Sequence, residues 1–409
     1  MNRSLQNNIR TIYLLGFFQH FMVVVPVFVP LLQGHGLSMS EVLQTQALFA
    51  LTIALFEVPS GYLADIWGRR KAILVGSAFN AAGFISLLWA NSFEDFLVYE
   101  VLLGIGFSLI SGADLALLYD TEVYLADRGL PGGAGAGKSL SRLIAAEAGA
   151  SGMAGITASV LLLAWTMDSI VIVQAFTGLV PLVLGLALVE VPRPGTIAST
   201  GANAKRIVEL LLFGKPVVLW TAMAIAAYGL LAVYVFWIYQ KYWEAQAIPV
   251  SHYGYIWAAF ALTVSFAARY AGALEQRLGT RSVLCLVGLL PVVGLAGMAL
   301  ASGWIGVLFG FALQFSRGIT MSLFYEALNR RVPGDFRATV NSLVSLVVRA
   351  VFIVTGPVLG YALDRIGVQS TLVLMLAIFT PVIAVVLVPL FIRIAREERD
   401  DEAQPVPAN

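Results

Sequence analysis

Long apolar runs dominate this chain and limit what it can fold into. Each run has about 20 residues or more, the length that an α-helix needs to cross the hydrocarbon core of a bilayer. The chain of 409 residues is 59% hydrophobic and 12% charged, which leaves more apolar surface than one soluble core can bury. We therefore predict an all-α membrane protein with twelve transmembrane helices, over residues 11–32, 43–64, 72–91, 96–119, 139–162, 169–190, 216–238, 252–274, 282–301, 304–326, 338–361 and 370–392.

The twelve runs fall into two groups of six. The stretch PRPGTIASTGANAKR, residues 192–206, separates the groups and is rich in Pro, Gly, Ser and Thr, as linkers are. We predict an N-terminal six-helix bundle over 1–191, a cytoplasmic linker over 192–215 and a C-terminal six-helix bundle over 216–393. Residues 394–409 are strongly polar, and we expect a disordered cytoplasmic tail there.

A ten-residue motif occurs once in each half. Gly61–Arg70 reads GYLADIWGRR and Gly272–Arg281 reads GALEQRLGTR, so that two glycines, a leucine and the last arginine recur in register. Each copy lies between the second and third apolar run of its half. An internal repeat of this kind indicates two similar membrane-embedded halves, as secondary transporters have.

The basic residues indicate how the chain is oriented. If both termini are cytoplasmic, only Lys241 and Arg365 fall in external segments, which satisfies the positive-inside rule. We therefore expect a multi-pass protein of the bacterial inner membrane with cytoplasmic N- and C-termini, and we expect a monomer. The external end of the seventh run carries aromatic residues that we interpret as an interfacial belt: Tyr234, Trp237, Tyr239, Tyr242 and Trp243.

Six plus six runs, with G-x-L-A-D-x-x-G-R-R between the second and third, resemble the major facilitator superfamily over essentially the whole chain. The resemblance implies a two-bundle fold and a cytoplasmic gate at the motif. In that gate Asp65 pairs with charges at the junction of the halves, and Arg69 links it to an acid at the inner end of the fourth span. Asp120 is the first candidate for this acid and Glu122 the second. The gate residues are then Gly61, Asp65, Gly68, Arg69, Arg70 and Asp120.

The gate has a simpler alternative. These charges could only end the helices and fix the topology, without any part in a conformational change. The second copy of the motif has Gln276 where the first has Asp65, so the carboxylate pairing cannot be duplicated there.

Polar and charged side chains inside the runs are candidates for a substrate and proton pathway, because they are costly in a bilayer. In the first half they are mainly acidic and in the second half basic. They are His20, Glu57, Asp114 and Glu147 in the first half, and Gln314, Arg317, Asn341 and Arg349 in the second.

Several of these residues have structural alternatives. Glu57 and Asp114 could belong to the gate, since both lie about two turns from the predicted cytoplasmic helix ends. Glu147 could pair with Arg142. His20 could be a hydrogen-bonded interior histidine, although imidazole chemistry suits proton transfer near neutral pH and a buried carboxyl group could serve as well.

Spacing predicts which residues share a helical face. In the fourth run, Glu100, Gly104, Ser108, Ser111 and Asp114 recur three or four positions apart, so we expect them on one face of a continuous helix. In the fifth run, small residues recur every four positions, which predicts close helix approach. These small residues are Ala146, Ala150, Ala154 and Ala158, beside Ser151, Gly155 and Ser159.

One motif match conflicts with its surroundings. Residues 132–139, GGAGAGKS, satisfy the P-loop pattern G-x-x-x-x-G-K-S/T. A P-loop follows a buried strand in a nucleotide-binding domain, whereas this segment follows an apolar helical run. We interpret it as a Gly-rich loop and the start of a helix, without phosphate binding.

Taken together, these features predict a proton-coupled secondary transporter of small organic molecules. Export of drug-like or amphipathic compounds is the leading hypothesis, although drug exporters of the superfamily carry a Gly-Pro motif in the fifth span and this chain has Gly356-Pro357 in the eleventh instead. The alternative is uptake or exchange of an anionic or zwitterionic metabolite held by Arg317 and Arg349. A receptor or scaffold that transports nothing is a third reading.

Other activities lack support in the sequence. A net charge of +1 gives no basic excess for a nucleic-acid partner. The single cysteine, Cys285, excludes an intramolecular disulfide and a Cys-based metal site. No nucleophile, base and orienting group lie together, and His20, His35 and His252 are far apart in the sequence. We therefore expect no enzyme activity, no metal and no cofactor, with the proton gradient as energy source.

Overall fold

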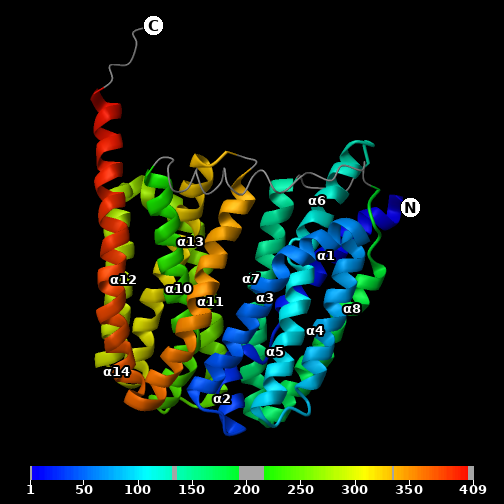
Figure 1. Ribbon diagram of the computed structural model, residues 1–409, viewed down its shortest axis with the longest axis horizontal. Coiled ribbons are helices and arrows are strands. Elements are labelled where there is room, and N and C mark those ends of the chain that lie inside the picture. The colour runs from blue at the N-terminus through cyan, green and yellow to red at the C-terminus, as the bar shows by residue number, and fades with distance from the viewer. Residues whose placement is uncertain (1, 131–135, 193–215, 334–335, 404–409) are drawn as a thin grey trace. The chain divides into compact units, whose positions relative to one another are not determined.

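A computed structural model of the protein describes residues 2–130, 136–192, 216–333 and 336–403, with side chains between residues 5 and 393 of these ranges except 136, 137 and 338. All regular elements in the described ranges are helices (Figure 1). The first half forms α1 (Asn2–His20), η1 (Val25–Val27), α2 (Phe28–Gly34), α3 (Met39–Trp67), α4 (Arg69–Ser86), α5 (Phe93–Ile110), α6 (Ala113–Ala126), α7 (Ala136–Ala164) and α8 (Met167–Ala187). The second half forms α10 (Pro216–Ala245), η2 (Val250–His252), α11 (Tyr253–Leu278), α12 (Thr280–Leu300), α13 (Gly303–Arg331) and α14 (Arg337–Ala403).

Ten helical segments of the described chain are long and apolar enough to cross a membrane. The last of them, Thr339–Arg393, covers the final two predicted runs, because α14 contains a non-helical residue at Gly367 with φ 75° and ψ 173°. The third predicted run corresponds to α4, which begins with three basic residues. Every predicted run therefore lies largely on helix, and the all-α membrane fold is confirmed.

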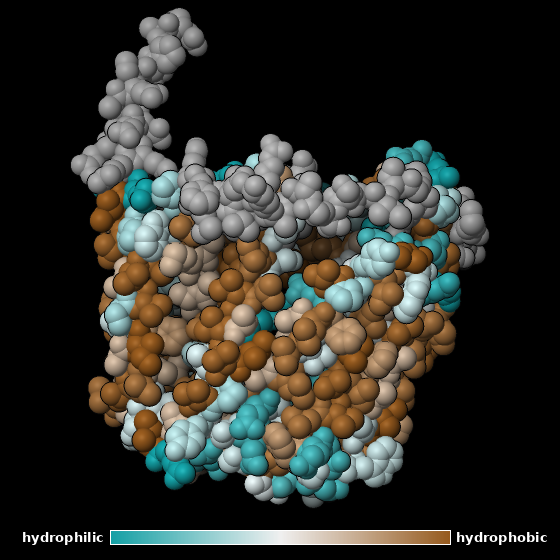
Figure 2. All heavy atoms as spheres, in the orientation of Figure 1, coloured by the Kyte–Doolittle hydropathy of each residue, from teal (hydrophilic) through white to brown (hydrophobic). Residues whose placement is uncertain are grey.

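Apolar side chains cover much of the surface that lipid would contact. Figure 2 shows brown residues over wide areas of the visible face. Among the most exposed large side chains are Leu262 at 70%, Phe176 at 69% and Val354 at 69%. Exposure of this extent is costly in water and is expected where a bilayer covers the protein.

The chain packs as two compact units. Unit 1 comprises Met1–Thr196, Ile248–Ala261 and Phe352–Asp364, and unit 2 comprises Ile197–Ala247, Leu262–Val351 and Arg365–Asn409. The units differ from the two sequence halves, because the start of α11 and a middle section of α14 are packed with the first half.

Unit 1 is built around close helix contacts. Helices α3, α4 and α5 lie side by side (Figure 1). An apolar cluster joins α1 and α6 to residues of α3, α4, α5 and α7 and to the segment that follows α8. Its fully buried side chains include Leu5, Ile12, Ile73 and Leu117. Ser38 and Ser92 begin α3 and α5 with capping boxes, in which Glu41 and Asp95 complete the reciprocal hydrogen bonds.

The first predicted span is interrupted in unit 1. Helix α1 ends at His20, and regular structure resumes at Val25 with a short turn that contains Pro26. The Val24 N–H, which the break leaves without a helical partner, donates to Gln174 Oε1 of α8 at 3.3 Å. The break is therefore stabilised by a side chain 150 positions away.

The fourth predicted span is also interrupted, and the prediction of one continuous helix there is wrong. Helix α5 ends at Ile110, Ser111 has an extended ψ of 123°, and Gly112 has a φ of 82° before α6 begins. Glycine adopts this left-handed φ at no steric cost. The break separates Ser111 and Asp114 from the α5 face that carries Glu100.

Two segments from the second half of the sequence, the start of α11 and the section of α14 over residues 352–364, pack against helices of the first half within unit 1. The α14 section approaches the start of α3, where a Cβ at Gly360 would lie 2.5 Å from the Met39 carbonyl oxygen. The start of α11 approaches α7, where a Cβ at Gly254 would lie 1.9 Å from the Gly155 carbonyl oxygen. The Tyr255 N–H donates to Ser159 Oγ at 3.0 Å. The close approach predicted from the small residues of the fifth run is confirmed.

Unit 2 has an aromatic core in α10, and this corrects the predicted interfacial belt. Tyr239, Tyr242 and Trp243 are at most 1% exposed, and Tyr234 is 7% exposed. The rings of Tyr239 and Trp243 stack with centroids 5.9 Å apart, and Tyr239 OH donates to the Gly310 carbonyl at 3.2 Å. These side chains face protein because α10 packs against α13.

The C-terminal segment is helical where it is described. Helix α14 continues to Ala403, so the prediction of disorder is wrong for residues 394–403. The sequence RIAREERDDEA consists mostly of residues with high helix propensity, which allows the helix to extend. Residues 404–409, and residues 193–215 of the predicted linker, lie outside the described residues.

Candidate functional site

Three of the predicted pathway residues come together from three helices of unit 1. Asp114 of α6 interacts electrostatically with both Glu147 of α7 and His20 of α1, and Glu147 also interacts with His20. The three side chains are half-buried. The Glu147 carboxyl group also lies against α1, since a Cβ at Gly16 would be 3.5 Å from Glu147 Oε1. We call His20, Asp114 and Glu147 the acidic histidine site.

The two helix breaks of unit 1 position this site. His20 is the last residue of α1, and Asp114 lies in the first turn of α6. Asp114 Oδ1 accepts the Leu115 N–H at 2.6 Å, and a carboxylate is favoured at a helix N-terminus by the helix dipole. A protonated histidine is favoured at the end of a helix for the same reason. Interrupted membrane helices place such helix ends next to binding sites in transporters.

The hydrogen bond of His20 decides which ring nitrogen is available. His20 Nδ1 lies 3.0 Å from the Gly16 carbonyl oxygen, which can only accept. Nδ1 therefore carries a hydrogen, and Nε2 is the nitrogen that can gain or lose a proton. The site thus holds two carboxyl groups and one imidazole nitrogen that can exchange protons.

Aromatic side chains lie close to His20 in the sequence, two on the last turn of α1 and one directly after it. Phe17 and Phe21 stack with ring centroids 5.7 Å apart, and Phe18 contacts Phe17 edge-on at 5.3 Å. All three are half-buried. Three aromatic side chains therefore lie within four positions of His20 in the sequence.

Other buried polar groups of unit 1 lie elsewhere. Glu57 is half-buried on α3, and it is not among the charges that act on Asp114 or Glu147. Glu100 of α5 is 3% exposed and accepts a hydrogen bond from Gln46 Nε2 of α3. Glu100 was predicted to lie on a polar face of its helix. Gln46 was not predicted as its partner, because the only sign of it in the sequence is one amide side chain inside an apolar run.

In unit 2, two predicted residues surround the Tyr239 hydroxyl. Gln314 hydrogen-bonds to this hydroxyl, and Arg317 interacts with it electrostatically. Among the described residues, no carboxylate forms an ion pair with Arg317. A cavity of about 20 Å³ adjoins Arg317, Gln314 and Tyr228, enough for about one water molecule.

The other two predicted residues of the second half do not line this cavity. Asn341 of α14 donates to Asn329 Oδ1 of α13 at 3.0 Å. Arg349 is half-buried on α14, two helical turns beyond Asn341. Neither residue lines the cavity beside Arg317.

At the first copy of the repeated motif, Arg69 pairs with the predicted acid. Arg69 Nη1 lies 2.5 Å from Asp120 Oδ2, and it also donates to the Ala116 carbonyl. Both side chains of the ion pair are about one-fifth exposed, at 19% and 20%. Arg69 thereby connects the start of α4 to the second half of α6.

The structure adds Glu190 to this motif. Its carboxylate accepts the Arg69 N–H at 3.0 Å and the Arg70 N–H at 2.8 Å, which caps the N-terminus of α4. Gly68, with φ 98°, lies so close that a Cβ there would be 2.8 Å from Glu190 Oε2. The sequence carries little signal for this contact, because the partners of Glu190 are backbone groups 121 and 120 positions away.

The remaining motif residues are at the surface of unit 1. Asp65 and Gly61 are exposed on α3, and a Cβ at Gly61 would meet no atom within 4 Å. Arg70 donates through Nη2 to the Leu186 carbonyl at 3.1 Å. The motif thus has a packed side at Gly68 and an open side at Gly61.

The second motif copy repeats the backbone conformation of the first, but its Gly279 has no close neighbour among the described residues. Gly279 has φ 80° and ψ 153°, close to the 98° and 146° of Gly68. A Cβ at Gly279 would meet no atom within 4 Å, and Gln276 is exposed. The first half of the P-loop-like segment, residues 132–135, lies outside the described residues, and its second half, residues 136–139, begins α7.

Comparison with known proteins identifies the architecture. The sequence pattern of the Major Facilitator Superfamily matches residues 11–351. A crystal structure of the nucleoside transporter NupG superimposes with a TM-score of 0.72 at 11% identity, covering 94% of this chain and 99% of that one. A bacterial homolog of the human lysosomal transporter Spinster, in an inward-facing and unoccupied conformation, gives 0.71 at 16% identity, covering 100% and 99%. A D-xylose–proton symporter gives 0.66 at 12% identity, covering 92% and 96%.

Proposed function

The chain belongs to the major facilitator superfamily, and from this premise we propose that it is a proton-coupled exporter of small, amphipathic organic molecules. It is a transporter and not an enzyme. The proposal places it in the bacterial inner membrane as a monomer, with cytoplasmic termini and the proton gradient as energy source.

The acidic histidine site carries the proposal of proton coupling. His20, Asp114 and Glu147 come from three helices, and two of these helices are interrupted at the site. Proton uptake by this group would change its charge, and hence its affinity for a bound molecule. The neighbouring Phe17, Phe18 and Phe21 would contact the apolar part of the same molecule. One proton and one substrate can then compete for a single site.

The contacts along α3 support alternating access. Near its start, Met39 and Leu43 are fully buried, and the α14 section packs over Met39. Near its end, Val58 is 80% exposed and Tyr62 is 63% exposed. We infer that the start of α3 lies at the closed, external end and that its exposed end packs against other helices when the transporter reverses.

The test first requires a substrate. It then requires one assay for substrate exchange and another for transport driven by the proton gradient. A thermal-shift screen of the purified protein against metabolites and antibiotics at two pH values would identify ligands whose binding is linked to protons. The ligand would then be followed in proteoliposomes with and without a pH gradient. We expect Asp114→Asn and Glu147→Gln to abolish gradient-driven accumulation while exchange of labelled for unlabelled ligand continues.

Asp168→Asn provides the matched control for these variants. Asp168 also lies in the first turn of a helix, α8, and is exposed. We expect this variant to retain both gradient-driven accumulation and exchange. If Asp114→Asn and Glu147→Gln accumulate the ligand as well as Asp168→Asn does, the proton-coupling proposal is wrong.

Arg317 favours one alternative substrate class. A half-buried guanidinium with no ion-paired carboxylate among the described residues is suited to an anionic or zwitterionic metabolite. In this alternative Arg317 and Arg349 both bind the substrate, and transport is uptake or exchange. Loss of anion transport in Arg317→Ala and Arg349→Ala would favour it, whereas gradient-dependent extrusion of neutral and cationic dyes by both variants would contradict it.

A further inference from the structure

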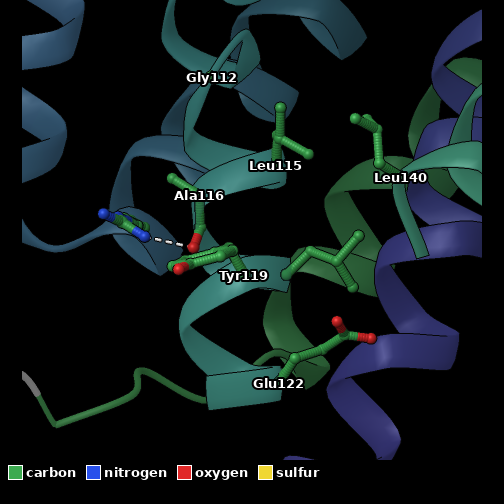
Figure 3. Close-up of a pocket in the computed structure, with 8 residues that line it drawn as sticks. Gly112, Leu115, Ala116, Tyr119, Glu122 and Leu140 are labelled. Atoms are coloured by element: carbon green, nitrogen blue, oxygen red, sulfur yellow. Dashed lines mark hydrogen bonds between the residues drawn. The ribbon is translucent and has the colours of Figure 1, made fainter. Parts of the chain in front are cut away.

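Unit 1 contains a cavity that does not include His20, Asp114 or Glu147 among its lining residues. Its volume is about 470 Å³, within the range of about 300–1,000 Å³ that small-molecule pockets occupy. Most of its lining comes from α6, with one residue each from the starts of α4 and α7 (Figure 3). Leu115, Leu118, Tyr119 and Leu140 provide an apolar lining. We call this cavity the α6 pocket.

Glu122 contributes a carboxyl group to the α6 pocket that the protein satisfies only in part. The residue is 6% exposed, and its Oε1 accepts a hydrogen bond from Ser139 Oγ. Among the described residues, Glu122 Oε2 is buried and has no hydrogen-bond partner. A buried polar atom without a partner is costly. Because Oε2 has almost no accessible surface, a small turn of the Glu122 side chain would bring it to a donor in the pocket, and that hydrogen bond would add affinity. Figure 3 shows the carboxyl group beside the apolar lining, below Leu140.

The charges around the α6 pocket favour a cation. Arg69 also lines the pocket, but its guanidinium is paired with Asp120 at 2.5 Å and donates to the Ala116 carbonyl. Because Asp120 balances the charge of Arg69, the carboxylate of Glu122 gives the pocket lining a formal charge that is negative. Lys138 and Arg142 of α7 are exposed and do not line the pocket.

We propose that the α6 pocket binds an amphipathic organic cation. Its charged group lies at Glu122, and its apolar body lies against Leu115, Tyr119 and Leu140. Tyr119 is 55% exposed and lines the pocket, and an aromatic ring attracts a cation. This inference rests on the proposed function and specifies its substrate class.

The pocket and the acidic histidine site share helix α6. Glu122 and Asp114 are eight positions apart on α6, which is about 12 Å along a helix. A cation bound at Glu122 would therefore have a second carboxyl group within reach along the same helix.

Two probes of the same shape and opposite charge test the proposal. Tetraphenylphosphonium is an aromatic cation, and tetraphenylborate is its anionic counterpart. Equilibrium binding of each labelled probe to the purified full-length protein in neutral detergent measures affinity without requiring transport. We expect the cation to bind, Glu122→Gln to weaken it about tenfold, and the anion to bind at least about tenfold more weakly than the cation.

Two further variants separate loss of the pocket from loss of the fold. Glu94→Gln makes the same chemical change at an exposed position of α5 and should leave cation affinity unchanged. Leu140→Trp adds volume at a partly exposed lining residue, at 37%, and should abolish cation binding while the unfolding temperature stays close to that of the wild type.

The outcomes distinguish this proposal from the transport function. Three results would each contradict the proposal that the α6 pocket binds a cation. They are equal cation affinity in Glu122→Gln and Glu94→Gln, equal binding of both probes, and no binding of the cation to the wild type. Cation binding that depends on Glu122, combined with no transport of any screened ligand in proteoliposomes, would uphold the pocket and contradict the transport proposal.

Discussion

The Asp364 carboxylate accepts the backbone N–H of Ser40 at 2.8 Å, although the two residues are 324 positions apart. Its other oxygen accepts the Met39 N–H at 2.9 Å, so that a residue of α14 caps the N-terminus of α3. This cap exists only while the two helices are in contact. It therefore favours the conformation in which the start of α3 is closed.

Replacement of Asp364 should open that end. We expect Asp364→Asn to weaken the closed contact by about 1 kcal/mol, the typical contribution of a helix cap. Met39 is fully buried beneath the contact, so a cysteine placed there reports on opening. In a Cys285→Ser background, Met39→Cys should react faster with a maleimide when Asp364→Asn is added, and no faster when Asp168→Asn is added. An unchanged rate would show that the cap does not hold the contact.

The glycine contact between α7 and α11 should behave in the same way. A Cβ at Gly254 would lie 1.9 Å from the Gly155 carbonyl oxygen, so Gly254→Ala must separate the helices. Gly272→Ala lies on the same helix, where a Cβ meets no atom within 4 Å, and serves as the control. We expect faster labelling of Ser159→Cys with Gly254→Ala only. If Ser159→Cys is labelled at similar rates with Gly254→Ala and with Gly272→Ala, the close contact at Gly254 does not hold α7 and α11 together.

Gly68 should tolerate alanine less well than Gly279. Both have positive φ, and an alanine at either position costs about 1–3 kcal/mol in backbone strain. Only Gly68→Ala also displaces Glu190 from the N–H groups of Arg69 and Arg70, which adds about 1 kcal/mol. Thermal unfolding should therefore show a larger loss of stability for Gly68→Ala. Equal losses would mean that the Glu190 contact contributes nothing.

The two copies of the motif should contribute unequally to transport. Asp65 lies on the helix that precedes Gly68, and Arg69 is paired with Asp120, whereas Gln276 is exposed in the second copy. We expect Asp65→Asn to slow transport in proteoliposomes far more than Gln276→Ala does. The protein level in the vesicles must be matched before the rates are compared. If both variants slow transport equally, the two copies of the motif contribute equally and this prediction is wrong.

Several features could be predicted because they depend on local sequence. The apolar runs fix which segments are membrane helices, since about 20 residues are needed to cross a bilayer. The small residues of α7 recur with the helical period, so their common face and a close helix approach follow from spacing, whereas the partner, Gly254 of α11, was found only in the structure. The repeated motif indicated the family and proposed Asp120 as the partner of Arg69, and the structure shows that ion pair.

The features that were not predicted from the sequence all depend on contacts between distant segments. The breaks at residues 21–24 and 111–112 were not predicted, because glycine and proline also occur inside unbroken helices of this chain, such as Pro59 in α3. Glu190 was missed because it caps backbone N–H groups, which every residue but proline has, so the sequence does not mark the partner. The buried Tyr239 was assigned to the surface because a tyrosine at a helix end fits either environment.

The sequence by itself determined that this chain is a helical membrane protein with two related halves and a short set of costly buried charges. Those properties follow from hydrophobicity and spacing, which act within one helix. Only the tertiary structure decided that His20, Asp114 and Glu147 meet, that Asp364 caps α3, and that Glu122 faces a pocket. These contacts join residues from different helices, and their formation depends on how the helices pack rather than on any local pattern.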